Sequence, residues 1–417
     1  MTGYSVTLMV GLGLIVVGII VLFFLPQRQG GMVKAFTVEV DAPGAGVVLI
    51  VVGLAAMAWA APQVPQLAAF AGSTAPTQTA TPATTVATGR PTPDPGTGGQ
   101  PSLCATAQPI ALHCALVRPL TGHADAVWSL SFARDGTRLL SSGYKDPPAI
   151  VWNVLDGSVI TRYRGQVGDI VAAAWSPSDP NLAATGAWDG TIRLWDVNRG
   201  TETWRAPENH TGLVRSIGWD STGRRLASAG DDARVVIWEP GADSPERLVF
   251  HLNGQTPYAL AWKPSNELGQ TVAAGIGDGR LMLWDAETGG ESSIPAASTA
   301  VHALAWTPDA NQIALGSDDG TVRLWNDRLG VRVLTPSHAK TVYSLAWSPD
   351  GELLASGSDD GVVRFWRRTQ EGAQPIGELK EDRGGVFALA WGSNELLAIG
   401  RQDDPRHEIE LVRVTRA

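Results

Sequence analysis

Three groups of histidine, serine and aspartate recur along the chain, and these are the residue types of a hydrolase triad. The groups are His123, Ser142 and Asp146; His210, Ser228 and Asp232; and His338, Ser356 and Asp360. A triad needs one exposed serine beside an oxyanion hole, whereas three copies at matched spacing indicate a repeated structural role. Hydrogen-bonded histidine and aspartate satisfy buried polar groups and stiffen a sheet. We therefore expect these groups to be structural and the protein not to be an enzyme.

Adjacent aspartates are a second candidate for chemistry, as ligands of a cation. The pairs are Asp231-Asp232, Asp318-Asp319 and Asp359-Asp360. They lack the alternate-oxygen spacing of a calcium loop. The sequence also has no phosphate-binding loop, zinc motif or nucleophile elbow. We expect no metal and no cofactor.

The elements that must hold these residues repeat along the chain. Residues 353–366 read LLASGSDDGVVRFW, and the apolar run, Asp-Gly turn and alternating strand predict an antiparallel hairpin. Similar stretches end at tryptophans spaced by 43, 43, 46, 41 and 41 residues: Trp152, Trp195, Trp238, Trp284, Trp325 and Trp366. A second aromatic marker occurs once per unit, at Phe132, Trp175, Trp219, Trp262, Trp306, Trp347 and Trp391. This period predicts an all-β fold, a seven-bladed β-propeller.

The last unit supplies only three of the four strands that a blade needs, in residues 385–391, 396–400 and 408–414. An apolar stretch, residues 110–118, precedes the first unit. We predict that it forms the outer strand of the last blade, because this closure leaves no open seam in the ring. The propeller then occupies residues 104–417.

Two apolar runs lie near the N-terminus, in residues 5–25 and 46–62. The first is long enough to span a bilayer as a helix, and a cleaved signal peptide is the alternative. The second is shorter and could lie partly in the interface. Arg28 and Lys34 between the runs place this loop in the cytoplasm by the positive-inside rule. The expected protein is multi-pass in the cell membrane, with an extracytoplasmic propeller after a disordered Thr/Pro/Ala-rich linker, residues 73–103.

Cys104 and Cys114 are the only cysteines, and their spacing is not that of a metal motif. In an exported domain they would form a disulfide that pins the start of the propeller. In a cytosolic domain they would be two thiols, and the sequence leaves both possibilities open. The net charge of −9 argues against nucleic acid as a partner.

The units resemble the WD-repeat family of β-propellers, the fold of the G-protein β subunit, over about residues 110–417. The Trp-Asp pair stands at Trp195-Asp196 and Trp284-Asp285. With its N-terminal runs, the chain is similar to a bacterial-type, membrane-anchored member. The resemblance implies a hydrogen-bonded tetrad of histidine, serine or threonine, aspartate and tryptophan within a blade. The three His/Ser/Asp groups would complete such tetrads with Trp152, Trp238 and Trp366.

Other units keep only part of the tetrad. The second unit keeps Thr185, Asp189 and Trp195 but lacks the histidine. Units four and five keep only an aspartate and a tryptophan, namely Asp278 with Trp284 and Asp319 with Trp325. The seventh unit keeps no convincing member.

The resemblance also implies a binding face around the channel entrance. The residues four positions before each aromatic marker would crown this entrance: Trp128, Val171, Arg215, Tyr258, His302, Tyr343 and Phe387. The residues before the turn aspartates would form a rim on the same face: Lys145, Trp188, Asp231, Gly277, Asp318 and Asp359. Four of the seven crown residues are aromatic, although aromatics make up only 7% of the chain. The alternative is that these rings merely plug the channel mouth, and the resemblance favours binding, because this face is the common docking surface of the family.

An aromatic centre with an acidic rim suits a protein or peptide that presents an arginine or lysine. We expect a membrane-tethered, non-catalytic scaffold for protein–protein interactions, because WD-repeat propellers usually act as scaffolds. The alternative is a small-molecule sensor or enzyme that uses the channel mouth, with His302 and Arg215 as its polar groups.

Overall fold

The computed structural model describes residues 112–416 except 145–148, 167, 208–209, 243–244 and 266–270. Both predicted membrane spans, the linker, Cys104, Lys145 and Asp146 lie outside the described residues. Within the described part, no helix has the length and apolar character needed to cross a membrane.

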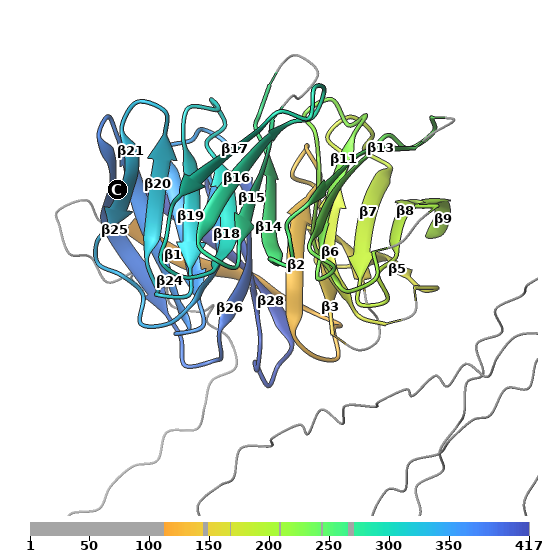
Figure 1. Cartoon of the computed structure of the whole chain (residues 1–417). Helices are drawn as coiled ribbons and strands as arrows, with labels where there is room; N and C mark the ends of the chain where they lie inside the picture. The colour runs from red at the N-terminus through yellow and green to blue at the C-terminus, as the bar shows by residue number, and fades with distance from the viewer. Residues whose placement is uncertain are drawn as a thin grey trace, which may run out of the picture. The chain divides into compact units, whose positions relative to one another are not determined.

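Seven four-stranded antiparallel sheets form a closed ring (Figure 1). The innermost strand of each sheet contacts that of the next, and the last of them, β26, contacts the first, β2. The prediction of a seven-bladed propeller is therefore confirmed for the described chain. Each blade is numbered by its innermost strand, so that blade 1 begins with β2 and blade 7 with β26.

The strand bounds follow chain order within each blade. Blades 1 to 3 contain β2 (Val127–Phe132), β3 (Arg138–Gly143), β4 (Ala149–Asn153), β5 (Val159–Tyr163), β6 (Ile170–Trp175), β7 (Leu182–Ala187), β8 (Ile192–Asp196), β9 (Thr201–Arg205), β10 (Val214–Trp219), β11 (Leu226–Gly230), β12 (Arg234–Trp238) and β13 (Glu246–His251). Blades 4 and 5 contain β14 (Pro257–Trp262), β15 (Thr271–Ile276), β16 (Arg280–Asp285), β17 (Glu291–Pro295), β18 (Val301–Trp306), β19 (Ile313–Ser317), β20 (Val322–Asn326) and β21 (Gly330–Leu334). Blades 6 and 7 contain β22 (Val342–Trp347), β23 (Leu353–Ser358), β24 (Val362–Thr369), β25 (Gly372–Lys380), β26 (Val386–Ser393), β27 (Leu396–Arg401), β28 (Glu408–Arg416) and β1 (Leu112–Thr121).

The ring is closed by the strand that precedes the first blade, as predicted. β1 pairs antiparallel with β28, from Leu112 opposite Arg416 to Thr121 opposite Glu408. The last sheet thus has the order β1-β28-β27-β26, with strands from both ends of the described chain. Cys114 lies on β1, is buried and is disulfide-bonded. Its predicted partner, Cys104, is outside the described residues.

Tight turns with glycine let the second and third strands of a blade pair closely. In the Asp-Gly turn before β20, Gly320 has a φ of 76°, a backbone conformation that residues other than glycine rarely adopt. A Cβ atom there would also lie 2.3 Å from the carbonyl oxygen of His338. The turn therefore needs glycine for its backbone conformation and for its contact with the next blade.

The second aromatic marker holds neighbouring blades together. In five blades its indole Nε1–H donates to a carbonyl oxygen of the preceding blade: Trp219 to Ala174 (3.3 Å), Trp262 to Gly218 (2.9 Å), Trp306 to Ala261 (3.3 Å), Trp347 to Ala305 (3.1 Å) and Trp391 to Ala346 (3.0 Å). Phe132 has this position in blade 1 and carries no donor. Its ring packs so closely on Gly392 of blade 7 that a Cβ there would lie 2.6 Å from it.

Two blades contain the hydrogen-bonded tetrad that the family resemblance implies. Trp238 Nε1 donates to the Ser228 hydroxyl (2.8 Å), which lies 2.8 Å from His210 Nε2, and His210 Nδ1 lies 2.8 Å from Asp232. In blade 6, the corresponding residues are Trp366, Ser356, His338 and Asp360, with distances of 2.9, 2.8 and 3.2 Å. Both hydroxyls are fully buried.

The serine assigned to the first tetrad needs correction. Trp152 Nε1 donates to Ser141 (2.7 Å), and His123 Nε2 lies 2.6 Å from the same hydroxyl. The Ser142 hydroxyl is buried without a hydrogen-bond partner among the described residues. The bonded serine lies 11 residues before the tryptophan in blade 1 and 10 residues before it in blades 3 and 6, so that counting back ten from Trp152 selects the wrong serine. The histidine-to-serine spacing of 18, shared by all three tetrads, selects Ser141.

Blade 2 replaces the missing histidine with a glutamine that the sequence reading overlooked. Trp195 Nε1 donates to Thr185 (2.7 Å), and the Thr185 hydroxyl donates to Gln166 Oε1 (2.8 Å). Gln166 Nε2 in turn donates to the Thr191 hydroxyl (2.8 Å). An amide therefore takes the place of the imidazole, and the Thr191 hydroxyl links it to the Asp189 carboxylate.

In blade 7, Ile399 and Val412 stand at the serine and tryptophan positions of the tetrad, and charged residues form a separate buried cluster. Arg401 is almost fully buried and donates to the carbonyl oxygens of Gly361 (3.1 Å) and Gly384 (3.2 Å). Its guanidinium also lies 3.6 Å from the buried carboxylate of Glu410. Because Gly361 belongs to the β23–β24 turn, Arg401 joins blade 6 to blade 7.

Candidate functional site

Every predicted crown residue lies at a β-bulge in the innermost strand of its blade. The pairing register shifts once at the start of each of these strands, and the skipped residues are Trp128, Val171, Arg215, Tyr258, His302, Tyr343 and Phe387. A bulge changes the direction of the extra side chain relative to the regular alternation of the strand. The backbone thus presents one residue per blade at the channel mouth, whatever its type.

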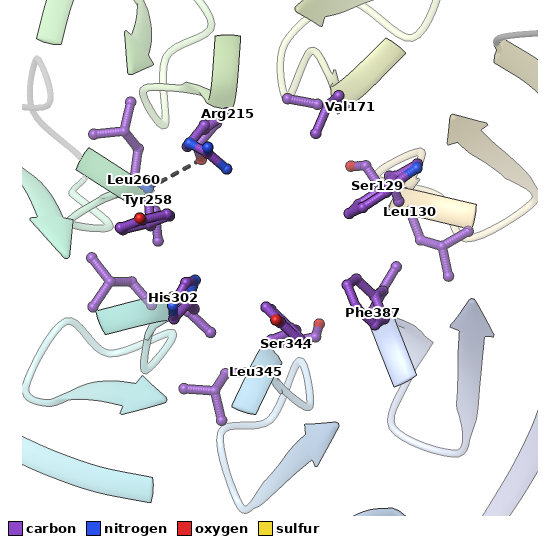
Figure 2. Close-up of a pocket in the computed structure, with 18 of the residues that line it drawn as sticks. Ser129, Leu130, Val171, Arg215, Tyr258, Leu260, His302, Ser344, Leu345 and Phe387 are labelled. Carbon is purple, nitrogen blue, oxygen red and sulfur yellow. Dashed lines mark hydrogen bonds between the residues drawn. The ribbon is translucent and has the colours of Figure 1, made fainter. Parts of the chain in front are cut away.

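The crown forms the upper layer of a funnel of about 290 Å³ (Figure 2). A ring of small residues lies one position further along each strand: Ser129, Ala172, Ser216, Ala259, Ala303, Ser344 and Ala388. The next position adds a mainly aliphatic ring of Leu130, Ala173, Ile217, Leu260, Leu304, Leu345 and Leu389. The mouth is therefore a funnel three residues deep rather than a flat surface.

The serine hydroxyls of the small-residue ring are engaged in the fold. The Ser216 hydroxyl accepts a hydrogen bond from Leu260 N (3.1 Å), shown as the dashed line in Figure 2. The Ser344 hydroxyl accepts one from Leu389 N (2.8 Å). Each bond joins one innermost strand to the next. These serines stabilise the channel wall.

The crown side chains contact one another around most of the mouth (Figure 2). The Arg215 guanidinium lies 4.8 Å from the Tyr258 ring, and ring centroids are 4.3 Å apart for Tyr258–His302, 5.3 Å for His302–Tyr343, 4.2 Å for Tyr343–Phe387 and 5.2 Å for Phe387–Trp128. We call this series the aromatic arc. It is interrupted only in blade 2, where Val171 supplies a small aliphatic side chain.

Each predicted acidic rim residue already has a cationic or imidazole partner. The pairs are Arg215–Asp231, His302–Asp318 (2.8 Å) and Lys340–Asp359 (3.1 Å). The carboxylate side chains of these pairs remain 35%, 44% and 40% exposed, respectively. They keep room for further hydrogen bonds, but the rim is not an unneutralised acidic surface.

His302 is the ionisable group at the centre of the arc. Burial lowers the pKa of His302, the Asp318 carboxylate opposes this effect, and the Arg215 charge adds to it. The net pKa lies below the ordinary value of 6.5. His302 is therefore mainly neutral at pH 7, and its Nε2–H donates to Asp318.

The remaining rim positions differ from one another. Trp188 is exposed in the turn between β7 and β8, and it is the largest apolar side chain on this face with more than half of its surface exposed. Gly277 adds no side chain. Within the described residues, no group of three or more histidine, cysteine, aspartate or glutamate side chains is arranged to hold a metal ion.

The fold and its tetrads define a class of protein, a seven-bladed β-propeller built from repeats. The family described as "WD domain, G-beta repeat" matches residues 114–146, 157–196, 203–239, 291–326 and 330–367. These matches support placing the chain in the WD-repeat β-propeller family. The unmatched stretches, 240–290 and 368–417, contain most of blades 4 and 7, which the aromatic markers and the sheets identify.

Curated relatives resemble only part of the chain. Protein HIR1 of Cryptococcus neoformans is 29% identical over 36% of this chain and 19% of its own length. "Cell division cycle 20.6, cofactor of APC complex" of Arabidopsis thaliana is 27% identical over 45% of this chain and 44% of its own. The guanine nucleotide-binding protein subunit beta of Oryza sativa is 26% identical over 40% and 46%. The chain thus spans less than half the length of these relatives.

Proposed function

We propose that this protein is a membrane-tethered, non-catalytic scaffold that binds a protein or peptide partner through the crown. The observation that carries the proposal is the aromatic arc, placed at the channel mouth by a bulge in every blade. Tyrosine, tryptophan and arginine are the residues most enriched in binding hot spots, and the crown contains all three. The fold's relatives add support, because one is named as a cofactor of a complex and another as a subunit.

The membrane tether and the extracytoplasmic side belong to this proposal and rest on the sequence alone. Residues 5–25 and 46–62 are the apolar runs that would anchor the chain. Anchoring would raise the effective concentration of the propeller near membrane partners. A bacterial-type member is proposed on the same ground.

Cross-linked co-purification of the full-length chain from its source cells tests the docking face. The variant Trp128→Ala/Tyr343→Ala removes two arc rings, and Leu155→Ala is the control, because Leu155 is 84% exposed in the β4–β5 loop at the other end of the strands. Partners retained by the wild type and the control but lost by the double variant support the crown. The same partners on all three proteins would contradict it. Recovery from the membrane fraction tests the tether separately.

A small-molecule sensor or enzyme remains a second candidate, because the mouth is a funnel rather than a flat face. Its volume of about 290 Å³ lies at the lower end of the range for ligand pockets. His302 and Arg215 are its polar groups, and each is already bonded to a rim aspartate. A metabolite panel that raises the melting temperature of the wild type but not of Arg215→Gln would favour this function.

A further inference from the structure

In the mouth, the position above the Tyr258 ring and beside Asp231 would suit a cation, and a cation of the protein itself occupies it. Arg215 lies over the Tyr258 ring and pairs with Asp231. The other rim carboxylates, Asp318 and Asp359, also have intramolecular partners. A basic side chain of a partner that binds in the mouth would have to share these carboxylates with their present partners. A subsite outside the mouth, without such competition, is the alternative.

Blade 2 offers such a subsite on the same face. Trp188 is 53% exposed, and its backbone N–H donates to the Asp169 carbonyl (3.0 Å). Since Ala187 pairs with Ile170, the neighbouring Trp188 lies beside the bulge at Val171. Trp188, an indole with more than half of its surface exposed, therefore belongs to the blade in which the aromatic arc is interrupted.

The charge around this indole is suited to a cation. Asp189 follows Trp188 and is exposed to solvent, while its Oδ1 accepts bonds from Thr191 N (3.0 Å) and Oγ1 (2.6 Å). Those bonds hold the carboxylate in the turn that Trp188 begins. Tryptophan is the most favourable aromatic face for a cation, and a nearby carboxylate adds a charge contact. An arginine can stack on the indole and also bond to the carboxylate.

We propose that Trp188 and Asp189 bind an arginine or lysine of an extended peptide that fills the mouth and leaves it over Val171. This inference rests on the proposed function and defines its partner. Elsewhere around the mouth, the contacting rings of the aromatic arc form a continuous wall. Val171 is the small aliphatic residue of the crown, and the exposed Trp188 belongs to the same blade, directly after the residue that pairs with Ile170. The partner is thus a peptide segment with a basic residue a few positions from its mouth-filling residue.

A random dodecapeptide phage library, selected on the full-length chain, tests this partner chemistry. The targets are the wild type, Trp188→Ala, Val171→Trp and the control Leu155→Ala, each with an unchanged melting temperature. On the wild type and the control, we expect arginine and lysine to be enriched at least about threefold at a fixed distance from an apolar residue. Trp188→Ala should keep the apolar preference and weaken the basic one, because only the Asp189 charge remains. Val171→Trp should lose both, because its indole closes the passage.

Synthetic copies of an enriched peptide give the matched control. Replacing its arginine with citrulline, which keeps the shape and removes the charge, should weaken binding to the wild type about two- to fivefold. On Trp188→Ala, the difference between the two peptides should shrink, because only the charge contact with Asp189 remains. An acidic preference, or a citrulline effect as large on Trp188→Ala as on the wild type, would overturn the inference and leave the crown function intact. Equal selection on the wild type and Val171→Trp would overturn the path over Val171, whereas the crown function is decided by the Trp128→Ala/Tyr343→Ala variant.

Discussion

A buried hydroxyl is the centre of each tetrad, and this position explains why the histidines are not catalytic bases. Ser228 and Ser356 are fully buried and accept an indole N–H, so neither can reach a substrate. In blade 2, Thr185 and Gln166 make the same network without an imidazole. The fold thus requires an acceptor for the indole and a partner for the hydroxyl. It does not require a group that transfers protons.

Replacing Asp360 with alanine tests the tetrad of blade 6. Asp360 accepts bonds from Ala339 N (2.8 Å) and Val362 N (3.0 Å) and lies beside His338 Nδ1. Asp360→Ala should lower the free energy of unfolding by about 1–3 kcal/mol, because buried donors lose their acceptor. Urea denaturation at pH 7 measures this loss. Exposed Asp327 supplies the control, since Asp327→Ala should change stability by less than about 0.5 kcal/mol.

The same carboxylate makes stability depend on acid pH. Burial raises the pKa of Asp360, but the bonds from His338 and the backbone outweigh it and hold the pKa well below its ordinary 3.8. A lowered folded-state pKa contributes stability above the ordinary value, and this contribution is lost as pH falls toward the folded-state pKa. The stability gap between wild type and Asp360→Ala should therefore narrow below about pH 4. A constant gap from pH 7 to pH 3 would contradict the assignment.

His302 gives a separate titration at the mouth. Its pKa should lie below 6.5, since burial outweighs the attraction of Asp318. Asp318→Asn should lower the pKa of His302 further, and Arg215→Gln should raise it, because it removes a nearby positive charge. Proton NMR of the imidazole signals measures the shifts, with His302→Gln used to identify the peak. A pKa at or above 6.5 in the wild type would refute this environment.

At the scale of strands and blades, the interfaces between consecutive blades differ in the contacts that hold them together. We call each of these interfaces a seam. Five seams carry an indole-to-carbonyl bond, whereas the seam between blades 7 and 1 relies on the packing of Phe132 against Gly392. The latter seam also contains Leu120 of β1 in its core. The seam nearest the closing strand β1 is thus the one held by apolar packing.

Gly392→Ala should weaken that seam. The added methyl group would lie 2.6 Å from the Phe132 ring, so the blades must separate slightly or the ring must move. We expect a loss of about 1–3 kcal/mol in the free energy of unfolding, as for other overpacked cores. Gly290→Ala is the control, because its nearest neighbour is a threonine hydroxyl at 3.4 Å. Equal stability of the two variants would rule out the tight contact.

Sequence reasoning predicted repeating elements well and individual partners less well. The period of the tryptophans gave seven blades, and the apolar stretch before the first unit indicated the closing strand. Ser141 was missed because it lies 11 residues before Trp152, whereas the spacing in blades 3 and 6 is 10. Gln166 was missed because only histidine was sought at its position. The rim pairs His302–Asp318 and Arg215–Asp231 join residues 16 apart, and only the bulges bring their side chains together.

For the whole molecule, closure of the ring depends on β1. Leu120 packs in a core that includes Trp152 of blade 1 and Leu411 of blade 7. Both ends of the described chain meet in one sheet, in which β1 covers the outer side of β28. We therefore expect the last blade, which presents Phe387 in the crown, to lose stability when β1 leaves the sheet.

Leu120→Ala tests this dependence. Truncation of a fully buried leucine should cost about 2–5 kcal/mol and lower the urea midpoint of the whole propeller. Val117→Ala on the same strand is the control, because Val117 is exposed and should contribute less than about 0.5 kcal/mol. A change confined to local protease sensitivity near β1, with an unaltered midpoint, would show that the ring tolerates an open seam.

The antiparallel pairing of β1 with β28 also determines how the propeller would respond to mechanical load. Residues before Leu112 join the domain at the end of β1 that lies away from the crown. A pull on the N-terminal segment against a partner held at the crown would run along the strand axis. The hydrogen bonds that join β1, from Leu112 to Thr121, to β28 would then share the force in shear instead of opening one after another. If the protein is anchored through its N-terminal segment, tension on a bound partner would thus load the β1–β28 pairing in shear, with all its hydrogen bonds resisting together.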